Sequence, residues 1–193
     1  MILVVDCGST KSPDILNCVE QSGFGGEIIG INSIIDALSL ENETNIKLEK
    51  FDRVIISGAP ILLSQIEDKS EYLKVAELFL SLKVPILGIC FGHQIIGMAY
   101  GAEVKMGQED RNSQTINIRK DDAILVGLKP QFIMAEDHCE FIDLPSDFDL
   151  LGSSKIAEVE IMKHQSSKVY GCQFHPEVSG QNGLKFIQNF LSI

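Results

Sequence analysis

A single cysteine stands between two glycines in the segment PILGICFGHQIIG, which begins at Pro85. An apolar run leads into Gly-Ile-Cys-Phe-Gly and a helical pattern follows at once, which is typical of a nucleophile elbow. A thiol at the start of a helix faces free backbone N–H groups, and these favour its reactive thiolate form. The alternative is that Cys90 is an inert core thiol, as most buried cysteines are. The elbow therefore needs a partner residue elsewhere in the chain.

A base for this nucleophile is present in the segment YGCQFHPEV, residues 170–178. His175 follows an apolar stretch and Glu177 comes two residues later, with Pro176 restricting the backbone before it to an extended form. Such a pair supplies a proton acceptor and a carboxylate that orients it. The alternative is a structural histidine beside a surface glutamate. Together with the elbow, the pattern predicts that Cys90 is the nucleophile and His175 the general base, and that the Glu177 carboxylate orients His175.

A third segment, IISGAP at residues 55–60, predicts a strand that ends in a tight loop. Backbone N–H groups in such a loop can point toward a carbonyl under attack. We expect the N–H groups of Ala59 and Phe91 to form an oxyanion hole, since Phe91 directly follows the nucleophile. The alternative for this short segment is a plain turn.

These residues belong to short apolar runs that alternate with amphipathic stretches, a pattern that predicts an α/β fold. Buried parallel strands are predicted at 2–6, 27–32, 53–57 and 84–89. Helices are predicted at 12–23, with Ser12 as N-cap, and at 71–83 and 93–101. After residue 103 the alternation of apolar and polar residues predicts further strands at 114–120, 132–137, 157–164 and 168–174, and then a closing helix at 179–193. We therefore expect one domain over residues 1–193, with an open, mixed, mostly parallel and flavodoxin-like sheet flanked by helices.

The composition is that of a globular domain, with 45% hydrophobic residues and a formal net charge of -11. This charge argues against nucleic acid and against an anionic membrane surface as partners. The apolar stretch near the N-terminus is too short for a signal peptide or a membrane span, so we expect a cytoplasmic protein. The five cysteines and four histidines show no metal-ligand spacing, and no metal or cofactor is expected.

Three segments in this order and spacing, ISGAP, PILGICFGHQIIGMAYGAEV and YGCQFHPEV, resemble the class I glutamine amidotransferases, the triad glutaminases. The resemblance extends over essentially the whole chain. It implies Cys90 as nucleophile, His175 as base and acid, Glu177 as its orienting residue, Ala59 and Phe91 as oxyanion donors, and Gln94 as a contact to bound glutamine.

Two further segments resemble the branch of this family found in GMP synthases. They are LPSDFDLLGSSKIAEVEIMKH, which ends at His164, and FHPEVSGQNGLKFIQNF. Three other segments depart from the family pattern. DCGSTK lacks the glutamine of Asp-x-Gly-x-Gln, SGAP has Ala59 in place of the second glycine of Ser-Gly-Gly-Pro, and AEDHCE replaces Ser-His-x-Asp.

The resemblance implies that the chain hydrolyses the side-chain amide of glutamine through a cysteine thioester. The sequence shows no Gly-x-x-x-x-Gly-Lys loop and no Ser-Gly-Gly-x-Asp-Ser segment for ATP. We therefore expect the ammonia to pass to a separate synthetase subunit. The resemblance implies that this subunit is of the ATP-pyrophosphatase type and makes GMP from XMP. Two alternatives stay open: a free-standing γ-glutamyl hydrolase or amidase of the same fold, and a catalytically degenerate paralogue that binds a partner or a metabolite.

Overall fold

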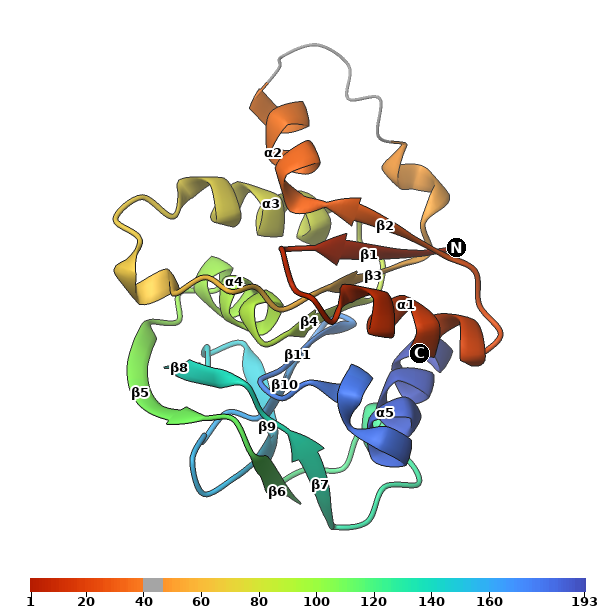
Figure 1. Cartoon of the computed structure of the whole chain (residues 1–193), viewed down its shortest axis with the longest axis vertical. Coiled ribbons are helices and arrows are strands. Elements are labelled where there is room, and N and C mark those ends of the chain that lie inside the picture. The colour runs from red at the N-terminus through yellow and green to blue at the C-terminus, as the bar shows by residue number, and fades with distance from the viewer. Residues whose placement is uncertain (40–46) are drawn as a thin grey trace.

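The apolar runs that precede the predicted site loops form neighbouring parallel strands (Figure 1). The computed structural model describes residues 1–39 and 47–193. Its parallel strands lie in the order β2, β1, β3, β4, β11, with bounds β1 Ile2–Asp6, β2 Gly26–Gly30, β3 Arg53–Ile56, β4 Ile86–Ile89 and β11 Val169–Cys172. Because these strands are parallel, the residues that follow β1, β3, β4 and β11 meet at one edge of the sheet.

The sheet continues beyond β11 with antiparallel strands, so the predicted mixed sheet is confirmed. These strands are β10 Ile161–His164, β9 Phe148–Ser153, β6 Ser113–Ile118 and β7 Gln131–Ala135. A separate ribbon pairs β5, Val104–Asp110, with β8, His138–Ile142. The short segment between β7 and β8 therefore connects the end of the large sheet to this ribbon.

Helices cover both faces of the sheet, as the strands without polar alternation predict (Figure 1). Side chains of Ile2 and Val4 pack with α1 and α5, whereas Leu3 and Val5 face α2, α3 and α4. The helices are α1 Ser12–Gln21, α2 Ile31–Ser39, α3 Ser70–Ser81, α4 Phe91–Ala99 and α5 Gly180–Ser192. None of the helices in the described part of the chain has the length and apolar character to cross a lipid bilayer.

Three local predictions from the sequence are wrong. The strand predicted at 27–32 ends at Gly30, and the amphipathic helix α2 follows without a turn. Ser12 is not the N-cap of α1: Lys11 holds that position, and the Ser12 hydroxyl instead donates to Asp6 Oδ1 at 2.7 Å. The strand predicted at 157–164 begins only at Ile161, because Ser154 and Ala157 close a turn before it.

Two glycines, Gly88 and Gly92, allow α4 to pack closely against β3 and β4. A Cβ atom on Gly88 would lie 2.4 Å from the backbone carbon of Gly92, and one on Gly92 would lie 2.3 Å from the Ile56 carbonyl oxygen. Neither distance is possible for a real side chain, so only glycine permits this contact between β3, β4 and α4. The turn at Cys90 is therefore set by backbone packing on both sides of it.

We predict that Gly88→Ala lowers the free energy of unfolding by about 1–3 kcal/mol, because the new methyl group would overlap rigid backbone. Gly30→Ala is the matched control, since a Cβ there would meet no atom within 4 Å, and its effect should stay within about 0.5 kcal/mol. Urea unfolding of both variants measures the difference. Equal free energies of unfolding for the two variants would show that β4 and α4 can move apart without loss of stability.

Candidate active site

Cys90 occupies the turn between β4 and α4 with a strained backbone, at φ 50° and ψ −104°. A positive φ in a residue other than glycine is unfavourable and persists only where the surroundings impose it. Here the Cys90 N–H donates to the Cys172 carbonyl at 2.8 Å, and the Cys90 carbonyl accepts from the Gln94 N–H at 3.0 Å. The predicted elbow is thus formed, with Cys90 held at the N-terminus of α4.

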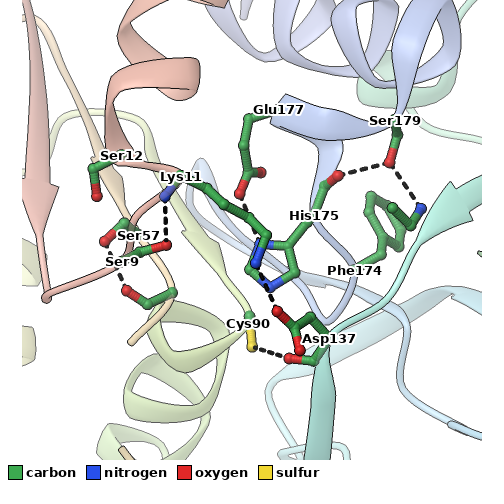
Figure 2. A network of polar contacts seen from close by, with 12 residues as sticks. Ser9, Lys11, Ser12, Ser57, Cys90, Asp137, Phe174, His175, Glu177 and Ser179 are labelled. Atoms are coloured by element: carbon green, nitrogen blue, oxygen red, sulfur yellow. Dashed lines mark hydrogen bonds and ion pairs between the residues drawn. The ribbon is translucent and has the colours of Figure 1, made fainter. Parts of the chain in front are cut away.

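His175 and Glu177 form a buried pair directly after β11 (Figure 2). His175 Nδ1 lies 2.7 Å from Glu177 Oε1, which orients the other ring nitrogen toward Cys90. The His175 backbone is also fixed, because its N–H donates to the Ala135 carbonyl at 2.9 Å and its carbonyl accepts from the Ser179 hydroxyl at 2.6 Å. Cys90, His175 and Glu177 are therefore brought together as the sequence predicts.

The imidazole of His175 is held in its protonated form. Burial by itself lowers the pKa of His175, but the hydrogen bonds and charges of Cys90 and Glu177 raise the pKa to about 10. At neutral pH the ring therefore carries a positive charge beside the Cys90 sulfur, which is the environment in which cysteine nucleophiles react as thiolates.

The loop after β3 lies against both side chains. A Cβ on Gly58 would approach the His175 Cε1 atom to 2.9 Å and the Cys90 Cβ to 3.7 Å, so the loop passes within van der Waals distance of the pair. Ser57 anchors the loop: its hydroxyl accepts from the Cys7 N–H at 2.9 Å and donates to the Gly58 carbonyl at 2.9 Å. Position 58 therefore requires glycine for reasons of space.

Ala59 and Phe91 both line the cavity above Cys90. Within residues 1–39 and 47–193 neither backbone N–H donates a hydrogen bond, so both are free to bind an incoming oxygen. Ala59 has no positive φ, and its replacement of a glycine in the SGAP segment therefore introduces no strain. These observations are compatible with the predicted oxyanion hole.

The cavity has a volume of about 520 Å³ and opens at the carboxyl edge of the parallel strands. Gln94 lines it from α4, and its amide nitrogen donates to the Glu140 carbonyl at 3.2 Å and to Gln173 Oε1 at 3.3 Å. Sequence reasoning did not identify the charged side chains at this cavity, Lys11, Glu109, Arg111, Asp137 and Glu140. Lys11 lies in DCGSTK, and Asp137 and Glu140 lie in AEDHCE. Both segments depart from the family pattern, and these departures could have indicated that their charged side chains line the cavity.

Glu140 supports the cavity wall and does not point freely into the cavity. Its two carboxylate oxygens accept from the backbone N–H groups of Leu63 at 2.8 Å and Ser64 at 2.7 Å. Two N–H groups that start a short helical turn thus satisfy this buried carboxylate. The loop after β3 is thereby connected to β8.

A cluster of buried titratable side chains, Asp110, Glu136, His138 and Glu160, lies on the inner side of the segment between β7 and β8. His138 Nε2 lies 3.1 Å from Glu136 Oε2. Burial, with a smaller contribution from neighbouring carboxyl groups, raises the pKa of both Glu136 and Glu160 to about 8. These two side chains are therefore carboxylic acids at neutral pH, which avoids burying uncompensated charge.

His93, the buried histidine of α4, lies apart from the His175–Glu177 pair. Its ring packs on β11, where a Cβ on Gly171 would lie 2.4 Å from His93 Nδ1. Burial lowers the pKa of His93 to about 3, so the ring is neutral. Among the described residues, no group of three or more histidine, cysteine or acidic side chains is placed to hold a metal ion.

The fold and the site together define an α/β protein with a cysteine elbow facing a buried His-Glu pair. The chain matches the family described as Glutamine amidotransferase class-I over residues 3–193. It therefore belongs to the class-I glutamine amidotransferase family.

Relatives in this family carry one recurring description, that of a subunit of glutamine-hydrolyzing GMP synthase. The protein of Pyrococcus furiosus is 34% identical over 196 residues, which span 100% of this chain and 98% of that protein. The protein of Saccharolobus solfataricus is 40% identical over 152 residues, 76% of this chain and 79% of that protein. A crystal structure from Thermoplasma acidophilum, described as the same GMP synthase subunit, superimposes with a TM-score of 0.84 at 27% identity, covering 99% of this chain and 92% of the other.

We predict that Glu160→Gln removes a pH dependence of stability. A carboxyl group whose pKa is raised from 4.5 to about 8 stabilises the fold at low pH, and this contribution is lost as the pH rises through that window. The wild type should therefore lose up to about 1.4 kcal/mol per pH unit relative to Glu160→Gln between pH 5 and 8.

Urea unfolding of both proteins across this pH range tests the prediction. Glu158→Gln, which changes an exposed neighbour of the same type, should follow the wild-type curve. If the wild type and Glu160→Gln instead give parallel curves, Glu160 does not retain its proton in the folded state.

Proposed function

We propose that residues 1–193 form one glutaminase domain, which hydrolyses the side-chain amide of glutamine and supplies the ammonia to a separate synthetase subunit in the cytoplasm. Family membership supports the amidotransferase activity, and the description of the relatives as one subunit of a GMP synthase supports a separate acceptor. That acceptor would be an ATP-pyrophosphatase-type subunit that converts XMP to GMP. The observation that carries the proposal is the strained Cys90 held next to the His175–Glu177 pair.

In the first step, the Cys90 thiolate attacks the amide carbon of glutamine. A carbon–sulfur bond forms and the carbonyl electrons move onto oxygen, giving a tetrahedral oxyanion. The N–H groups of Ala59 and Phe91 would stabilise this charge, because both line the cavity and neither has another acceptor in the described structure. Gln94, at the same wall, would contact the bound glutamine.

In the second step, the carbon–nitrogen bond breaks and the His175 imidazolium donates its proton to the leaving nitrogen, which departs as ammonia. A γ-glutamyl thioester remains on Cys90. The now neutral imidazole accepts a proton from water as the water attacks the thioester, and the carbon–sulfur bond breaks to release glutamate. Glu177 holds the imidazole in the required orientation throughout, through the 2.7 Å contact to Nδ1.

We predict that Cys90→Ala abolishes glutamate release from glutamine, with a loss of at least about 1,000-fold, because Cys90 is the thiol held beside the His175–Glu177 pair. Cys139→Ala is the matched control, since it removes the other thiol that lines the cavity. It should retain activity within a few fold. Release should also increase when the synthetase subunit of the same organism is added with ATP and XMP.

The possible results of this assay separate the alternatives. Undiminished release by Cys90→Ala would exclude the thioester route. Fast release by the wild type that no synthetase stimulates would favour a free-standing γ-glutamyl hydrolase or amidase. No release under any condition would favour a degenerate binding protein and would overturn the proposal.

We further predict that Gly58→Ala lowers kcat by about 100-fold while KM changes little. The methyl group would displace the His175 ring, and a misplacement of about 1 Å has this order of effect. Steady-state kinetics measure the change, and Gly25→Ala is the control, because a Cβ there meets no atom within 4 Å. Wild-type kcat in Gly58→Ala would show that His175 can move without consequence.

A further inference from the structure

Two opposite charges face each other beside the candidate nucleophile. Lys11 Nζ lies 2.7 Å from Asp137 Oδ2, and both residues line the cavity (Figure 2). Lys11 comes from the loop before α1, whereas Asp137 comes from the segment between β7 and β8. Their side chains are 25% and 42% exposed, so the pair lies at the cavity mouth and is still accessible to a ligand.

The pair lines the same cavity as Cys90, and Asp137 belongs to the segment whose backbone contacts the sulfur. The Cys90 Sγ atom is 3.9 Å from the Asp137 backbone oxygen, and the side chain of Asp137 lines the same cavity. In glutamine, two methylene groups separate the amide carbon from the carbon that bears the α-ammonium and the α-carboxylate. A glutamine with its amide at Sγ therefore brings these charges close to Lys11 and Asp137.

The charges of the pair complement those of an amino acid. Transferring a zwitterion into a cavity is costly unless each charge finds a partner. Hydrogen bonding to Lys11 lowers the pKa of Asp137, so the pair consists of an ammonium and a carboxylate. Because exposed ion pairs contribute little stability, separating this one to admit a zwitterion costs little.

Both side chains are presented by a fixed backbone, which reduces the entropy lost on binding. The Lys11 N–H donates to Ser9 Oγ at 3.1 Å, and the Lys11 carbonyl accepts from the first turn of α1. On the other side, Ala135 bridges to His175, and the Glu136 N–H donates to the Asn112 carbonyl at 2.8 Å, directly before Asp137.

The other charged groups at the cavity are less suited to this role. Glu140 is occupied by the N–H groups of Leu63 and Ser64. Arg111 is 73% exposed, pairs with Glu109 at 2.7 Å and lies 3.9 Å from Asp137, so it is farther out at the mouth.

We propose that Lys11 binds the α-carboxylate and Asp137 the α-ammonium of the substrate, which makes this pair the specificity determinant for a free amino acid. The inference rests on the proposed glutaminase function and adds to it two residues that no family motif includes. It also accounts for the presence of opposite charges in DCGSTK and AEDHCE, which lie far apart in the sequence.

Calorimetric binding to the full-length Cys90→Ala protein tests the proposal without turnover. The ligands are glutamine, 4-aminobutanamide, which lacks the α-carboxylate, and glutaramic acid, which lacks the α-ammonium. Adding Lys11→Met should weaken glutamine binding by about 10- to 100-fold and leave 4-aminobutanamide unchanged. Adding Asp137→Asn should weaken glutamine by a similar factor and leave glutaramic acid unchanged.

Two further variants serve as references. Lys50→Met, which breaks the exposed pair of Lys50 with Glu27 at 2.5 Å, should leave all three affinities unchanged. Arg111→Met tests the competing cation, and a selective loss of carboxylate recognition in this variant would overturn the assignment of Lys11.

An equal loss for all three ligands in Lys11→Met or Asp137→Asn would also overturn the proposal, since it would indicate a structural role. So would the absence of glutamine binding to the Cys90→Ala protein at millimolar concentration. The proposed glutaminase function fails in a different way, through selective binding without any ammonia release by the wild-type protein. The two failures are therefore distinguishable.

Discussion

The close backbone contact between Gly92 and the Ile56 carbonyl is the constraint on which the site depends. It draws the start of α4 onto β3, while Gly88 allows the same helix to lie on β4. With no room for a gradual turn, the chain must reverse at Cys90, and that residue adopts a positive φ. The strain is offset by burial of apolar surface on both faces of the sheet. The backbone conformation of Cys90 thus originates in packing some distance from the sulfur.

The second half of the site depends on a different kind of constraint, the antiparallel extension of the sheet. The bridge between Ala135 and His175 connects the end of β7 to the segment that follows β11. The Ser179 hydroxyl accepts from the Ala135 N–H and donates to the His175 carbonyl. The segment after β7 then places Asp137 in the cavity and Glu136 in the interior. One short connection therefore contacts both His175 and Cys90 and carries a buried acid.

The electrostatic arrangement separates charged from neutral groups. His175 keeps its proton because Cys90 and Glu177 outweigh the cost of its burial, whereas Glu136 and Glu160 keep theirs because burial dominates. The positively charged ring of His175 thus lies beside the sulfur, whereas Glu136 and Glu160 are neutral acids. At the cavity mouth, the hydrogen bond from Lys11 lowers the pKa of Asp137, which therefore remains a carboxylate. A ligand that enters from solvent therefore passes Lys11 and Asp137 before it reaches Cys90 and His175.

Local sequence was sufficient to predict the parallel strands β1 to β4, the elbow and the grouping of Cys90, His175 and Glu177, because each depends on short-range patterns and on the rule that parallel strands share a carboxyl edge. It did not predict that β11 is fully buried and parallel to β4. It did not reveal β5, β8 and β9, nor the end of the second strand at Gly30. The pairing of Lys11 with Asp137 and the burial of Glu136 and Glu160 were decided only by the tertiary structure. The physical reason is that protonation state and ion pairing depend on solvent exposure and on residues distant in sequence, which no local pattern encodes.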